Sequence, residues 1–192
     1  MSEEELIQLY VIIIAQILES MVGQATQELD MDNLTVFDSN AVPGITISSY
    51  LQRIMSNPNA TSRSMIMGIW YVNTLWENNL LPSSVTKFNV HRLIGISIMI
   101  ASKFYDEVHF SNNIWGEILG LELSEVNTLE QTFLTLIDFE VNLKIEWFMQ
   151  MLNTMLNFAI TNNVIELRVG KIILKTIYNA ALEEAKDGHS DD

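Results

Sequence analysis

Residues 87–105 read KFNVHRLIGISIMIASKFY, and this stretch decides the fold. Its apolar residues, from Leu93 through Ile100, fall on nearly every side of a helix instead of along one stripe. A helix of that kind is buried on all sides, so the stretch predicts the central helix of a bundle. Ser97 lies inside the helix, where we expect its hydroxyl to bond to a carbonyl of the preceding turn. Lys103 closes the apolar run, and its role there is the question that the sequence raises.

The rest of the chain also favours helices. Few stretches alternate as strands do, and the chain contains only three prolines. Ser111 and Ser124 are placed to cap helices, and Gly120 to end one in the left-handed conformation. Apolar residues at helical spacing predict further helices over Glu3–Glu28, Ser48–Met55, Ser62–Asn79, Ser111–Leu119, Ser124–Ile137, Ile145–Ile160 and Val164–Lys186. The fold class is therefore all-α, a five-helix bundle with additional N-terminal and C-terminal helices.

The composition narrows the function. Ten basic residues against 24 acidic ones give a formal net charge of −14, which disfavours binding to nucleic acid. Such a charge can attract basic protein surfaces or only maintain solubility, and charge alone leaves both interpretations open. The chain has no cysteine, which fits an intracellular location in the cytoplasm or nucleus. The apolar run Leu6–Leu18 is too short to span a membrane and is flanked by glutamates, so we expect a buried helix there and no membrane partner.

Motifs of catalysis and metal binding fail on inspection. Asp106-Glu107-Val108-His109 has the letters of a helicase magnesium box, but the chain has no glycine-rich phosphate loop to accompany it. The three histidines form no i,i+4 pair, and no carboxylate pattern predicts a raised pKa. We therefore expect no enzyme, no cofactor and no metal, and we expect His109 to lie on a surface loop.

Lys103 and Glu130 are the charged residues that carry information. Lys103 ends the central helix, and Glu130 interrupts an otherwise apolar and neutral face of a later helix. The two side chains could pair with each other as ordinary surface charges, which would contribute about 0 to 1 kcal/mol to stability. They could also border an apolar surface for a partner, and spacing alone leaves both interpretations open.

Residues Asn89–Val141 contain three motifs: VHRLIGISIMIASKF, NNIWGEILG and ELSEVNTLEQTFLTLIDFEVNL. Their order and spacing resemble the cyclin box, and within it the single-box cyclins of the P/U type. The stretches ISSYLQRI and WYVNTLW upstream resemble the first two helices of that box. The resemblance covers roughly residues 45–143. It implies a cyclin box over 45–143. The helical pattern and composition outside the box predict the other segments: 1–30 (N-terminal helix), 31–44 (linker), 144–186 (C-terminal helices) and 187–192 (frayed tail).

The resemblance also implies a function. A cyclin of this kind binds and activates a cyclin-dependent protein kinase. The net charge of −14 adds a separate hypothesis, that the acidic surface recruits basic protein substrates. By position, Lys103 and Glu130 match the pair that bonds the kinase near its regulatory helix. The positions that receive an apolar side chain of that helix are Phe104, Ile100, Leu134 and Val141. The alternative is an adaptor that keeps the box fold and holds a partner that is not a kinase.

Arg53 matches the buried structural arginine of the first box helix. In many cyclins that arginine pairs with an aspartate on the second helix, but Asn73 stands at that position here. A neutral amide can still accept from a guanidinium, although the opposite charge is lost.

Overall fold

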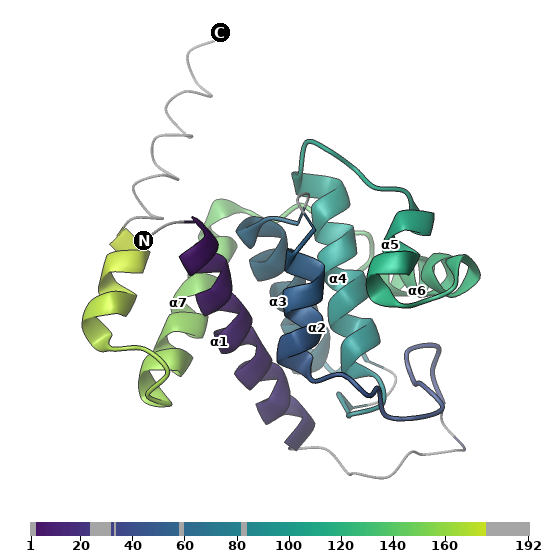
Figure 1. Ribbon diagram of the computed structural model, residues 1–192, viewed down its shortest axis with the longest axis horizontal. Helices are drawn as coiled ribbons and strands as arrows, with labels where there is room; N and C mark the ends of the chain where they lie inside the picture. The colour runs from purple at the N-terminus through teal and green to yellow at the C-terminus, as the bar shows by residue number, and fades with distance from the viewer. Residues whose placement is uncertain (1–2, 24–31, 33, 58–59, 82–83, 176–192) are drawn as a thin grey trace, which may run out of the picture. The chain divides into compact units, whose positions relative to one another are not determined.

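A computed structural model describes residues 3–23, 32, 34–57, 60–81 and 84–175 (Figure 1). The described residues are helical and contain no strand, which confirms the all-α prediction. Among these residues, the first compact unit, Met1–Asn142, holds α1 to α6, and the second, Leu143–Asp192, holds α7 and a further helical stretch over 167–175. The helices with defined bounds are α1 (Glu3–Gly23), α2 (Ile47–Met55), α3 (Ser62–Glu77), α4 (Val90–Tyr105), α5 (Asn112–Leu119), α6 (Leu123–Leu136) and α7 (Ile145–Thr161).

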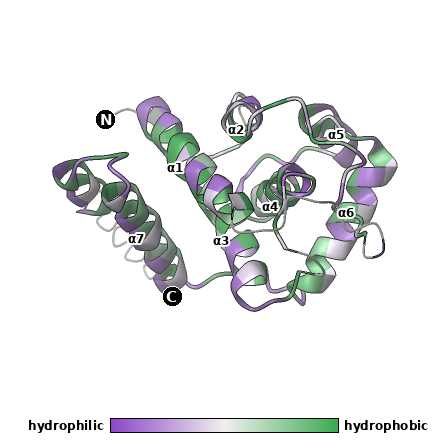
Figure 2. Cartoon of the chain, turned by 90° about the horizontal axis from the view of Figure 1, so that it is seen from below, coloured by the Kyte–Doolittle hydropathy of each residue, from purple (hydrophilic) through white to green (hydrophobic). Residues whose placement is uncertain are grey.

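Helix α4 is the centre of the first unit, as its composition predicts. Figure 2 shows it surrounded by other helices, and it contacts α2, α3, α5 and α6. Every residue from Leu93 to Ser102 is buried. Ser97 donates its hydroxyl to the Ile94 carbonyl at 2.8 Å, so that predicted bond is confirmed. A helix enclosed in this way fixes the direction in which its last turn, with Lys103, points.

Helices α3 and α4 approach closely because Gly68 has no side chain. A Cβ at Gly68 would lie 2.6 Å from Ile98 Cγ1 and 3.0 Å from the Ile98 backbone nitrogen. Both distances are shorter than van der Waals contact, about 3.5–4.0 Å between carbons. The absence of a side chain at position 68 therefore sets the separation of the two helices.

Local chemistry explains the helix ends. Thr46 caps α2 by accepting from the Ser49 amide, and Thr61 and Ser64 form a capping box at α3. Helix α5 ends at Gly120 in the left-handed conformation, φ 72°, as predicted. The prediction for α6 was wrong, because Glu122 and not Ser124 is the N-cap residue, paired with Glu125 in a capping box. Ser111 is the N-cap of α5 but makes no side-chain capping bond.

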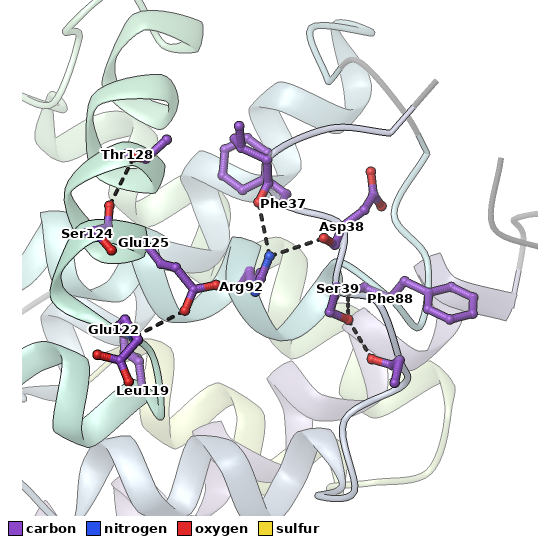
Figure 3. A network of polar contacts seen from close by, with 12 residues as sticks. Phe37, Asp38, Ser39, Phe88, Arg92, Leu119, Glu122, Ser124, Glu125 and Thr128 are labelled. Atoms are coloured by element: carbon purple, nitrogen blue, oxygen red, sulfur yellow. Dashed lines mark hydrogen bonds and ion pairs between the residues drawn. The ribbon is translucent and has the colours of Figure 1, made fainter. Parts of the chain in front are cut away.

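Residues 34–44, which lie within the predicted linker and which we call the strap, are attached to the helices around Phe37 and Asp38 (Figure 3). Phe37 is 1% exposed and meets Phe133 edge-to-face at 6.1 Å between ring centroids. Arg92 donates to the carbonyls of Val36 and Asp38 at 3.2 and 3.1 Å and to Glu125 Oε1 at 2.7 Å (Figure 3). One buried aromatic ring and one arginine therefore hold this part of the predicted linker in place. The rest of the predicted linker lies largely outside the described residues.

Helix α1 is the one described helix long and apolar enough to cross a membrane, a test that buried helices of soluble proteins also pass. It contacts α2 and α3, and Tyr10, Ile14 and Leu18 on it are fully buried. The contacts favour a core helix. It ends at Gly23, and the rest of the predicted stretch to Glu28 lies outside the described residues.

The second unit begins just before α7. Helix α7 ends at Thr161, and residues 167–175 are helical again after a turn. A Cβ at Gly170 would lie 2.9 Å from Ile160 Cδ1, so the two helical stretches are in close contact. The predicted helix Val164–Lys186 therefore begins at residue 167, three residues later than expected. Its residues 176–186, and the predicted tail 187–192, lie outside the described residues.

Candidate functional site

Lys103 and Glu130 meet where α4 and α6 lie side by side. The Lys103 Nζ donates to Glu130 Oε1 at 2.6 Å, and the side chains are 26% and 19% exposed. The lysine lies in the last turn of α4, where a positive charge also suits the negative end of the helix dipole. The two charged residues therefore pair within the chain, at a partly buried position that a partner could reach.

Asn112, the first residue of α5, completes this polar cluster. Its side-chain Oδ1 accepts from Lys103 Nζ, and its Nδ2 donates to Glu130 Oε2 at 2.7 Å and to Asn127 Oδ1 at 2.7 Å. Sequence reasoning missed Asn112, because an asparagine beside a helix start gives no signal beyond a tendency to cap. The cluster of Lys103, Glu130, Asn112 and Asn127 joins three helices, and we call it the polar cluster.

The apolar residues that the resemblance assigned to the partner surface differ in exposure. Phe104 is 47% exposed, whereas Ile100, one turn earlier on α4, is only 4% exposed. Leu134 lies one turn after Glu130 on α6, and both Leu134 and Val141 are half-buried. Ile100 thus lies beneath the surface, and Phe104 is the most exposed of the four residues.

Two tyrosines hold the segment that follows α6. Tyr71 and Tyr105 both donate to the Val141 carbonyl, at 2.7 and 2.8 Å. Burial is the main cause that raises the pKa of the Tyr71 hydroxyl above its usual value, so it stays a donor at neutral pH. The hydroxyls tie Val141 to α3 and α4, which fixes one border of the apolar surface.

One exposed apolar residue beside this surface was not predicted. Phe139 is 63% exposed, and its backbone amide donates to the Leu134 carbonyl at 2.8 Å. Asp138 and Phe139 adopt positive φ angles of 52° and 57°, a conformation rare for residues other than glycine. The chain thus reverses sharply after α6 and presents the Phe139 ring outward. Phe104, Phe139, Leu134 and Val141, together with the polar cluster, make up what we call the α4–α6 face.

Arg53 is exposed, not buried as the resemblance implied. Its Nη2 donates to the Glu117 carbonyl at 2.7 Å, near the C-terminal end of α5. The orphan carbonyls at a helix end accept a guanidinium readily, which explains why Arg53 needs no acid from α3. The replacement of an aspartate by Asn73 therefore leaves Arg53 with a partner.

His91, at the head of α4, is buried. Its Nε2 lies 2.9 Å from the Ile45 carbonyl, and its ring meets Tyr50 edge-to-face at 5.2 Å. A carbonyl only accepts, so Nε2 carries the proton, and Nδ1 is buried without a hydrogen-bond partner among the described residues. Burial lowers the pKa of His91 below its usual value, because the charged form would lose its hydration.

The loop after α4 contains Asp106-Glu107-Val108-His109, the sequence that resembles a helicase magnesium box. Asp106 accepts a bond from the Thr61 hydroxyl at 2.8 Å, whereas Glu107 and His109 are exposed. Among the described residues, no group of three or more histidine, aspartate or glutamate side chains could hold a metal ion. Asp106 is thus part of the contact between this loop and the start of α3.

Comparison with known proteins gives a consistent result. The family model for cyclins matches residues 12–141. Cyclin-U2-1 of Arabidopsis thaliana is 34% identical over 113 residues, 59% of this chain and 50% of the relative. Cyclin-U4-1 of the same plant is 34% identical over 110 residues, 57% of this chain and 54% of the relative. The PHO85 cyclin-like protein psl1 of Schizosaccharomyces pombe is 29% identical over 111 residues, 58% of this chain and 46% of the relative.

The chain belongs to the cyclin family. Within the family it is of the P/U type, as its similarity to the U-type cyclins and to the PHO85 cyclin-like protein shows. The match begins inside α1, earlier in the chain than the resemblance in sequence reached. The chain spans about half the length of the curated relatives that it matches.

Proposed function

We propose that this protein binds a cyclin-dependent protein kinase through the α4–α6 face and activates it. The observation that carries the proposal is a partly buried ion pair, Lys103 with Glu130 at 2.6 Å, beside the exposed ring of Phe104. Membership of the cyclin family supports the choice of a kinase as partner. The chain itself would perform no chemistry.

The proposed mechanism is a shift of the kinase between two states. A protein that binds the active arrangement better than the inactive one increases its population, and the shift is limited by the difference in affinity. On the α4–α6 face, apolar residues such as Phe104 and Phe139 would supply contact area, since both are exposed. The charged pair would supply oriented hydrogen bonds, which contribute more to the specificity of binding than to its affinity.

The test measures binding and activation of purified cyclin-dependent kinases from the source organism. Lys103→Ala and Glu130→Ala should each weaken binding by about 2–5 kcal/mol, or roughly 30-fold or more, because each leaves a charge unpaired. Lys87→Ala and Glu117→Ala are matched controls. Lys87 precedes the opposite end of α4 and Glu117 is exposed on α5, so neither should change binding.

Two results would contradict the proposal. No kinase bound by the wild type, or full binding by both variants with an intact fold, would favour the adaptor with a partner that is not a kinase. Circular dichroism and thermal melts of each variant show whether the fold is intact.

A contribution to substrate choice is the finer part of the proposal. A net charge of −14 attracts basic protein surfaces and raises their association rates. Replacing exposed acids outside the α4–α6 face, such as Glu117 and Glu146, by glutamine should slow phosphorylation of basic substrates selectively. An equal effect on all substrates would argue against this role. We also infer an intracellular location, in cytoplasm or nucleus, which tagging of the protein in its own cells would test.

A further inference from the structure

The side-chain amide of Asn112 is fully engaged in the polar cluster. Its oxygen accepts from the Lys103 ammonium, and its two N–H groups go to Glu130 Oε2 and Asn127 Oδ1, each at 2.7 Å. Asn112 is itself half-buried, whereas its neighbour Asn113 on the same helix is exposed. One neutral side chain therefore touches both members of the charged pair.

The charges on either side fix the orientation of this amide. An ammonium group only donates and a carboxylate only accepts, so the oxygen must face Lys103 and the nitrogen must face Glu130. The reverse orientation would bring an NH₂ group against the ammonium and an oxygen against the carboxylate. An aspartate at this position would accept from Lys103 but could not donate to Glu130 or Asn127.

We propose that Asn112 is a positioning residue for partner binding, which holds Lys103 and Glu130 in their binding orientation before the partner arrives. This inference rests on the proposed function, since it concerns the same face. Lysine has one of the most mobile side chains, and a partner that met it unrestrained would lose affinity in ordering it. The Lys103 ammonium has three N–H groups, and its bonds to Glu130 and Asn112 use two of them. These two bonds keep the pair oriented, and the third N–H group would donate to the partner.

The first test needs no partner. NMR relaxation of the Lys103 side chain, with the lysines labelled, reports how freely its ammonium end moves in the isolated protein. In the wild type the Lys103 signal should be that of a restrained side chain, and Asn112→Ala should release it, whereas Asn113→Ala should leave it unchanged. A Lys103 side chain equally mobile in the wild type and in Asn112→Ala would overturn the proposal.

The second test measures affinity for the kinase identified by the binding experiment. Asn112→Ala should weaken binding about tenfold, mainly through faster dissociation. The variant also loses three hydrogen bonds, so its melting temperature should fall, and its affinity is measured at a temperature where the variant remains fully folded. Asn112→Asp should weaken binding more, because it competes for Lys103 and repels Glu130.

The outcomes separate this inference from the proposed function. If Lys103→Ala abolishes binding but Asn112→Ala binds as the wild type does, the positioning role is overturned and the proposed function stands. If the wild type binds no kinase, the proposed function fails, and the positioning role for kinase binding fails with it. Weaker binding by Asn112→Ala together with a released Lys103 side chain would support both.

Discussion

Gly68→Ala tests the claim that the α3–α4 separation is set by a missing side chain. The added Cβ would lie 2.6 Å from Ile98 Cγ1, 3.0 Å from its backbone nitrogen and 3.1 Å from its Cα. Contacts between carbon atoms settle near 3.5–4.0 Å, so about 1 Å is missing at the side chain and somewhat less at the backbone. Rotation of Ile98 could relieve the first contact, but its backbone moves only if α4 moves.

The expected magnitude follows from two opposing effects. Overpacking of this kind costs about 1–3 kcal/mol, whereas glycine to alanine inside a helix gains about 0.5–1 kcal/mol. Ile98 is fully buried, so its rotation would disturb other core residues, and we expect the larger effect to win. The net loss of unfolding free energy is about 1–2 kcal/mol, which lowers the melting temperature by roughly 2–8 °C for a chain of this size.

The assay is thermal unfolding followed by circular dichroism, with hydrogen exchange to locate the loss in α3 and α4. Gly44→Ala is the matched control, since no atom lies within 4 Å of a Cβ at that exposed position. It should be neutral or slightly stabilising. A Gly68→Ala protein as stable as the wild type, or more stable, would refute the account of how α3 and α4 approach each other.

Three further changes probe the strap, the head of α4 and the segment after α6. Arg92→Met removes the donors to the Val36 and Asp38 carbonyls, so it should lower the free energy of unfolding by about 1–3 kcal/mol and speed hydrogen exchange across 34–40. Burial lowers the pKa of His91, so the unfolded chain binds the proton more tightly and the free energy of unfolding falls as the pH drops below about 6.5. Urea unfolding at a series of pH values should show a smaller fall for His91→Gln than for the wild type. Tyr105→Phe removes one of two hydroxyls from one carbonyl, so urea unfolding should show a loss of about 0.5–1.5 kcal/mol.

The spacing of apolar residues and the residues that end helices predicted much of the fold. The central helix was visible in its uniformly apolar residues, and the end of α5 in Gly120, because both depend on neighbours within a few positions. The start of α6 was placed wrongly because Ser124 and Glu122 both precede a helical pattern, and only the geometry of the turn decides between them. Sequence rules for capping therefore cannot identify the N-cap residue where two candidates lie within one turn of each other.

Contacts between residues far apart in the sequence could not be predicted from local sequence patterns. Phe37 lies in a stretch of polar and turn-forming residues, and its burial depends on Phe133, far away in the chain. Arg53 was expected to be buried because of a resemblance, but its partner is a backbone carbonyl, which any residue type supplies. Asn112 was missed for a similar reason, since an amide that bridges two charges looks in sequence like any other helix start.

The position of Lys103 links the fold to the proposed function. Lys103 lies in the last turn of an apolar helix, where its positive charge interacts favourably with the negative end of the helix dipole. It also pairs with Glu130, so it stabilises the free protein as well as a complex. Loss of binding in Lys103→Ala therefore has two causes that a binding assay alone cannot separate. Asn112→Ala removes neither charge, so the pair itself remains while its orientation is released. The variant loses three hydrogen bonds and some stability, so its binding is measured where it is fully folded. A binding defect under that condition, together with a released Lys103 side chain, would assign the effect to the geometry of the α4–α6 face and not to unfolding.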